Sequence, residues 1–195
     1  KRRLAFSTMS NLSYMLFGIM LLTPAGYLGG LSHMLFHGVI KMSLFLCAGA
    51  FMRQTGKNYV FEINGVGRKM PVTFICYTPG ALSLTGIPLF CGFISKWTLI
   101  SAGADEGSAL GIIGVVALIV SAFFCAMYTL TVSVRAFFPM KGKDFYADGT
   151  EGCAVKEAGW KMLVPVVVFT IANVLFGVFS GPIMSFLTKI AEGVI

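Results

Sequence analysis

Long uncharged runs alternate with short charged segments along this chain. Asp, Glu, Lys and Arg are absent from residues 4–40, 70–95, 107–134 and 162–188. Each run is longer than the roughly 20 apolar residues with which an α-helix crosses the hydrocarbon core of a bilayer. A helix on the surface of a soluble core would carry a polar stripe every 3.6 residues, and these runs lack one. The pattern therefore predicts an all-α, polytopic transmembrane helix bundle.

We expect about five membrane passes in a single transmembrane domain that covers residues 1–195. One pass, over residues 70–102, is long enough to be a discontinuous helix. Its break is predicted at Gly86 and Pro88, because proline lacks an N–H donor and its ring clashes with the carbonyl four residues earlier. The other four passes are predicted as single helices, over about residues 4–22, 27–52, 108–138 and 160–180.

The charges in the loops indicate how the discontinuous helix crosses. If it crosses once, twelve Lys and Arg residues fall on one side of the membrane and only Lys189 falls on the other. Two crossings would divide the basic loops between both sides. Because cytoplasmic loops are rich in Lys and Arg, we predict a single crossing. The N-terminus and the loops over about residues 53–69 and 139–159 are then cytoplasmic.

Composition excludes several classes of function. The chain is 56% hydrophobic and 12% charged, with a net charge of +7. Its basic residues lie in short loops without interleaved aromatics, which fits topology signals and argues against nucleic acid as a partner. The five cysteines have no CxxC spacing, and four lie in apolar runs where cysteine acts as a small hydrophobe. We therefore expect no metal site, no redox centre and no other cofactor in this chain.

Two lysines, Lys41 and Lys96, fall inside the predicted spans. A charged group at the bilayer centre costs roughly 2.5–3.5 kcal/mol on insertion scales, so such residues usually serve a function and face a protein-lined or hydrated interior. The alternative for Lys96 is that it lies near the end of its half-helix and extends its ammonium group to the interface.

His33 and His37 precede Lys41 at intervals of four residues, which places all three on one helix face over roughly 12 Å. Histidine exchanges protons near neutral pH, and a lysine withdrawn from water can do so too, so this stripe is a candidate proton path. The alternative is that both imidazoles only hydrogen-bond to neighbouring helices.

The predicted break at Gly86 and Pro88 also has a functional interpretation. Transporters place broken helices at their ion pathways, although a proline kink can also serve packing alone.

Three motifs resemble one family, the antiporter-like proton-pumping subunits of respiratory complex I, Mrp-type cation/proton antiporters and membrane-bound hydrogenases. Residues 1–15, KRRLAFSTMSNLSYM, resemble the KR-x-LAYSTxSQxGYM motif of that family. Residues 33–46 are similar to its HxxTHAFFKALLFL helix, and residues 86–96 resemble GIPPxxGFxSK in its discontinuous helix. The chain departs from these patterns at Asn11, Ser13, Gly38, Val39 and Trp97.

The resemblance implies that Lys96 is the lysine of the discontinuous helix at the outlet half of a proton path. Lys41, His37 and His33 would relay protons toward it. The chain is then expected to be a piece of a longer subunit, namely the second antiporter-like half-repeat with C-terminal helices, since nothing in it resembles the first half-repeat.

The same resemblance implies a subunit that moves H⁺, with or without exchange for Na⁺, in a bacterial or archaeal plasma membrane. Its partners would be the lipid bilayer and other membrane subunits of an energy-converting complex, and any electron transfer would belong to those subunits. Whether the chain is part of an enzyme depends on which of these complexes contains it. A self-contained secondary transporter and a structural membrane subunit without conduction are the alternatives.

Overall fold

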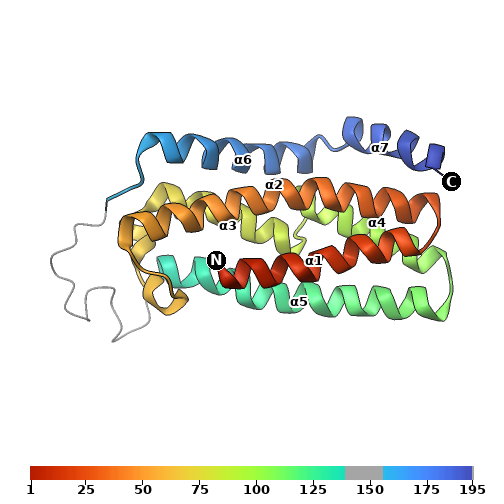
Figure 1. The fold of residues 1–195 in the computed structure, drawn as a ribbon, viewed down its shortest axis with the longest axis horizontal. Coiled ribbons are helices and arrows are strands. Elements are labelled where there is room, and N and C mark those ends of the chain that lie inside the picture. The colour runs from red at the N-terminus through yellow and green to blue at the C-terminus, as the bar shows by residue number, and fades with distance from the viewer. Residues whose placement is uncertain (139–155, 195) are drawn as a thin grey trace.

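The computed structural model describes residues 1–138 and 156–194, and these residues are helical apart from short connections (Figure 1). The prediction of an all-α bundle is confirmed, since the described residues contain no strand. They form the helices α1 (Arg2–Met20), α2 (Pro24–Thr55), α3 (Pro71–Thr85), α4 (Cys91–Asp105), α5 (Ala109–Phe137), α6 (Trp160–Val178) and α7 (Gly181–Val194), with two 3-10 turns at Val60–Ile63 and Val66–Arg68.

Helix α2 is the central element of the bundle and packs against α1, α3, α4, α6 and α7. Its start is defined by Thr23, whose hydroxyl accepts a hydrogen bond from Gly26 N at 3.1 Å, and by Pro24, which fits the first position of a helix. It ends at Gly56, where φ is +68°, a conformation that glycine adopts without strain. About half of the apolar stretch of α2 is buried against these five neighbours, while Met34, Leu35 and Met42 are exposed.

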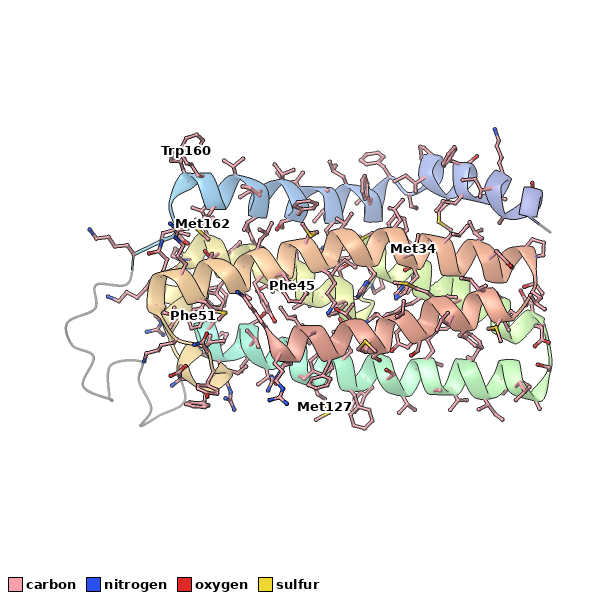
Figure 2. The ribbon with its side chains drawn as sticks, viewed as in Figure 1. Met34, Phe45, Phe51, Met127, Trp160 and Met162 are labelled. Atoms are coloured by element: carbon pink, nitrogen blue, oxygen red, sulfur yellow. The ribbon has the colours of Figure 1, made fainter. Side chains whose placement is uncertain are left out.

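The outer helices α5 and α6 are less buried than α2. Helices α5 and α6 are apolar but bury few of their side chains, and Figure 2 shows Met127 and Trp160 projecting away from the bundle. Among the described helices, α2, α5 and α6 are each long and apolar enough to cross a membrane by length and composition. An apolar outer surface of this extent is explained by lipid as the surrounding solvent. The chain is an integral membrane protein, and its number of passes stays a prediction.

The predicted discontinuous helix is present. Helix α3 ends at Thr85, α4 begins at Cys91, and α4 continues along the bundle in the direction of α3 (Figure 1). Each half has 15 residues, short of the roughly 20 that a span requires, so only the pair is long enough to cross. Between them, Gly86 has φ +93° and Leu89 has φ +81°, which is unfavourable for leucine. Pro88 lies within this break.

The N-terminal end of α3 is held by Glu157, which lies just before α6. Its carboxylate accepts hydrogen bonds from Val72 N at 2.9 Å and from Thr73 Oγ1 at 2.5 Å. An acidic group is favourable there, because the first backbone N–H groups of a helix have no partners within it. The first half of the discontinuous helix, α3, is therefore bound to the segment that leads into α6.

The connections fall at two ends of the bundle (Figure 1). Residues 56–70, the end of α5 and the start of α6 lie at one end, and the α1–α2 and α4–α5 connections lie at the other. This grouping agrees with a single crossing by the discontinuous helix. Of the second predicted loop, residues 139–155 lie outside the described part of the chain. Helix α7 continues in the direction of α6 and packs against α2.

Candidate proton path

Lys96 lies inside the bundle and is only 4% exposed, so its ammonium group does not extend to the interface. Its Nζ donates hydrogen bonds to Leu84 O at 2.6 Å and to Thr85 O at 3.2 Å. Both carbonyls belong to the last turn of α3, where carbonyl groups lack donors within the helix and where the helix dipole is negative. A cation from α4 thus caps the C-terminal end of α3 across the break.

In return, a side chain of α3 caps the N-terminal end of α4. Ser83 Oγ accepts a hydrogen bond from Gly92 N at 3.1 Å, in the first turn of α4. The two backbones approach so closely that a Cβ atom at Gly92 would lie 2.0 Å from Ser83 O. Glycine is therefore required at this position, and the two half-helices satisfy each other's free ends.

His33 connects α2 to both α1 and α4. Its Nδ1 lies 2.9 Å from Ser95 Oγ and its Nε2 lies 3.2 Å from Asn11 Oδ1. Asn11 donates from Nδ2 to Ser7 O at 2.8 Å, so the network assigns Oδ1 as the acceptor that faces His33. His33 Nε2 must then carry a hydrogen, which leaves Nδ1 as the nitrogen that changes its protonation.

Ser95 can satisfy His33 in both protonation states. Neutral His33 accepts at Nδ1 from the Ser95 hydroxyl, whereas protonated His33 donates from Nδ1 to Ser95 Oγ. In the second case the hydroxyl hydrogen can turn to Gly92 O, which lies 3.3 Å from Ser95 Oγ. Rotation of one hydroxyl group therefore accommodates a proton on His33 without movement of a heavier atom.

His37 and Lys41 continue the stripe along α2. The His33 and His37 rings stack with centroids 5.8 Å apart, and Lys41 Nζ donates to Leu4 O at 2.9 Å. His37 is 5% exposed and Lys41 is 6% exposed. Among the described residues, His37 Nε2 is buried without a hydrogen-bond partner. Buried polar atoms normally have one, so His37 is unusual in this array.

Tyr14 closes the gap between the stripe on α2 and Lys96 on α4. Its ring centroid lies 5.6 Å from that of His33 and 5.7 Å from Lys96 Nζ, close enough for a cation–π contact. The structure therefore brings together all four titratable residues that the sequence singled out, in the order Lys41, His37, His33, Lys96. Among the described residues, His, Cys, Asp and Glu form no group that could hold a metal ion.

Sequence reasoning missed the neutral side chains that connect these groups. Asn11, Tyr14, Ser83 and Ser95 are uncharged, and nothing in hydropathy separates them from ordinary polar residues of a membrane helix. One signal was available, because Ser7, Asn11 and Tyr14 recur at intervals of four and three in an otherwise apolar run and so share a helix face.

Comparison with known proteins identifies the family of this chain. The family model described as NADH:quinone oxidoreductase/Mrp antiporter, TM, matches residues 1–125. NADH-quinone oxidoreductase subunit N of Desulforudis audaxviator is 31% identical over 189 residues, which cover 94% of this chain and 37% of that protein. The chain thus spans little more than a third of the length of this relative.

Solved structures of membrane complexes contain chains with the same fold. A chain of the Mrp complex from Dietzia sp. DQ12-45-1b superposes with a TM-score of 0.83 at 22% identity, covering 96% of this chain and 41% of that one. A chain of the membrane-bound sulfane sulfur reductase, an archaeal respiratory membrane complex, superposes with a TM-score of 0.73 at 28% identity, covering 89% and 27%. Because the family model matches well over half of its residues, this chain belongs to the NADH:quinone oxidoreductase/Mrp antiporter transmembrane family.

Proposed function

We propose that this chain conducts protons through the membrane as part of an ion-translocating subunit in a multisubunit energy-converting complex. The observation that carries the proposal is the buried array of Lys41, His37, His33 and Lys96 in a bundle whose outer surface is apolar. Four titratable groups are energetically costly to keep in such surroundings, and residues of this kind usually serve a function.

The partners of both lysines favour proton exchange over a structural ion pair. Lys96 bonds to two backbone carbonyls and Lys41 to one, and within the described residues neither ammonium group pairs with a carboxylate. A lysine in a buried ion pair could lose its proton only by leaving an unpaired anion, which is expensive. A lysine held by carbonyl groups avoids this penalty.

The array also has a direction. Lys41, His37 and His33 extend over roughly 12 Å along α2, because residues four apart rise by about 6 Å in a helix. Lys41 contacts Leu4 near the start of α1, toward the end of the bundle with the basic residues 53–69, and His33 contacts Ser95 near the break. A cavity of about 830 Å³, lined by Arg2, Ser7 and other residues, adjoins the start of α1. We propose that this end is cytoplasmic and that protons pass between it and the break.

The class of complex that contains this chain is proposed by analogy with its relatives. Their names include a NADH-quinone oxidoreductase subunit, an Mrp complex and an archaeal sulfane sulfur reductase. We propose that other membrane subunits of a complex of this class are the partners, and that the membrane is a bacterial or archaeal plasma membrane. Lys96 would serve the outlet half of the path, with residues 1–195 forming the second half-repeat and the C-terminal helices. The transported ion is H⁺, with or without exchange for Na⁺.

His37 offers the sharpest test, because none of the observed hydrogen bonds explains an imidazole at this position. His33 is hydrogen-bonded on both sides, which also fits a structural role, whereas His37 Nε2 has no partner among the described residues. Replacing His37 by methionine therefore costs no observed hydrogen bond and roughly preserves volume. We expect His37→Met to assemble normally in the full-length subunit and to lower proton flux into membrane vesicles strongly.

The matched control is Met34→Leu, at a position on the same helix that is 59% exposed and is not part of the array. It should leave the flux unchanged. Equal proton flux in wild type and His37→Met would remove the relay along α2 and would favour a structural subunit without conduction.

A further inference from the structure

Helix α6 lies beyond the residues that the family model matches, yet it carries a buried polar side chain at the break. Asn173 is 0% exposed in a helix that is largely apolar. Its Nδ2 donates to Pro79 O at 3.3 Å, and its Oδ1 accepts from Cys91 Sγ at 3.0 Å. All of its amide group's observed bonds therefore go to the discontinuous helix.

The two partners of Asn173 belong to different halves of that helix. Pro79 lies within α3, and Cys91 is the first residue of α4. Helix α3 is weakened at Pro79, because proline supplies no N–H to the turn before it. A bond from α6 to this residue and to the start of α4 joins both half-helices to one side chain.

One turn later, α6 also touches the backbone of the break itself. A Cβ atom at Gly177 would lie 2.2 Å from Leu89 O and 2.7 Å from the main chain of Phe90. Leu89 has a positive φ, so neighbouring structure must hold it in place. Helix α6 thus supports the break at two successive turns, by hydrogen bonds at Asn173 and by close packing at Gly177.

We propose that Asn173 is a positioning residue that fixes α3 and α4 relative to each other and thereby keeps Lys96 against the carbonyls of Leu84 and Thr85. Lys96 lies on α4 and its acceptors lie on α3, so any shift between the halves changes these hydrogen bonds. The bond to Leu84 O is 2.6 Å long and would be lost after a shift of about 1 Å. The inference deepens the proposed function and rests on it.

The test uses Asn173→Ala in the full-length subunit within its complex, with Val174→Ala as the control at the neighbouring, partly exposed position. Spin labels at Ile75 on α3 and Trp97 on α4, both 59% exposed, report the distance between the two halves. We expect Asn173→Ala to broaden or shift this distance distribution and to lower proton flux about tenfold, since small misplacements of reacting groups have large effects on rate. Val174→Ala should change neither.

Asn173→Asp separates hydrogen bonding from packing. The neutral carboxyl group has the shape of the amide, and it can donate to Pro79 O while accepting from Cys91 Sγ. The carboxylate cannot donate and repels the carbonyl. We therefore expect Asn173→Asp to rescue proton flux at low pH and to lose the rescue as pH rises, relative to the pH profile of the wild type. A residue that only fills space would give parallel profiles.

Failure of this inference can be told apart from failure of the proposed function by including Lys96→Ala. An unchanged label distance and unchanged flux in Asn173→Ala, while Lys96→Ala loses flux, would overturn the positioning role alone. Full proton flux in Lys96→Ala would overturn the proposed function and, with it, any role of Asn173 in transport. In that case the label distance would still show whether Asn173 holds the two half-helices together.

Discussion

Replacing Gly92 by alanine should separate the two half-helices at the point where they are closest. The added Cβ atom would lie 2.0 Å from Ser83 O, whereas a carbon atom normally approaches a carbonyl oxygen no closer than about 3.3 Å. The start of α4 must therefore move away from α3 by about 1.3 Å. If α4 moves as one body, the distance from Lys96 Nζ to Leu84 O increases from 2.6 Å to at most about 3.9 Å, which lies beyond hydrogen-bonding range.

The energetic cost has two parts. Overpacking a tight contact costs about 1–3 kcal/mol. The lost bonds, from Gly92 N to Ser83 Oγ and from Lys96 Nζ to Leu84 O, contribute about 1 kcal/mol and about 1.5–3 kcal/mol respectively. We expect the free energy of unfolding, measured by denaturant titration in mixed detergent micelles, to fall by up to about 3.5–7 kcal/mol, the sum of these contributions. Proton flux in vesicles should fall with it.

Gly49→Ala on α2 provides the control, because a Cβ atom there meets nothing within 4 Å. Alanine in a helix interior is more favourable than glycine by roughly 0.5–1 kcal/mol, so this variant should be neutral or slightly more stable. A Gly92→Ala protein with the stability and the proton flux of Gly49→Ala would refute the close approach of the half-helices and the dependence of Lys96 on it.

Three further results are expected. Ser95→Ala should lower proton flux about tenfold, because His33 Nδ1 loses its hydrogen-bonding partner, whereas Ser95→Thr retains the hydroxyl and should keep most of the flux; equal flux in both would exclude the hydroxyl switch. Glu157→Gln should reduce the free energy of unfolding by about 1 kcal/mol by weakening the N-terminal cap of α3, and an unchanged value would argue against that cap. In a background without reactive cysteines, Asn58→Cys and Asp105→Cys should react with impermeant reagents from opposite sides of the membrane, and reaction from one side would restore two crossings.

The helices and the break could be predicted from the sequence because both depend on local properties. Long apolar segments predicted spans over residues 27–52 and 70–102, and the structure has α2 at Pro24–Thr55 and the pair α3–α4 between Pro71 and Asp105. The break followed from proline chemistry at Pro88 and from the freedom of Gly86, which does adopt a positive φ. The spacing of His33, His37 and Lys41 likewise placed them on one face of α2.

The hydrogen-bonding partners of these residues could not be predicted, because they depend on how neighbouring helices are rotated and aligned. Hydropathy does not encode that the face of α1 with Asn11 meets His33, or that Asn173 of α6 meets Cys91. Helix–helix contacts in membranes rely on close packing and scattered polar groups, which leave little periodic signal. The packing of α7 on α2 was missed for the same reason.

Proton flux in Lys96→Ala, measured with the intact complex in sealed vesicles under its normal driving force, tests the proposed path most directly. The control is Lys189→Ala, which removes an exposed lysine from α7 and keeps the net charge equal between the two variants. We predict that Lys96→Ala inserts and assembles but shows only the proton leak of inactive vesicles, while Lys189→Ala matches the wild type. Wild-type flux in Lys96→Ala would contradict a path through this buried lysine.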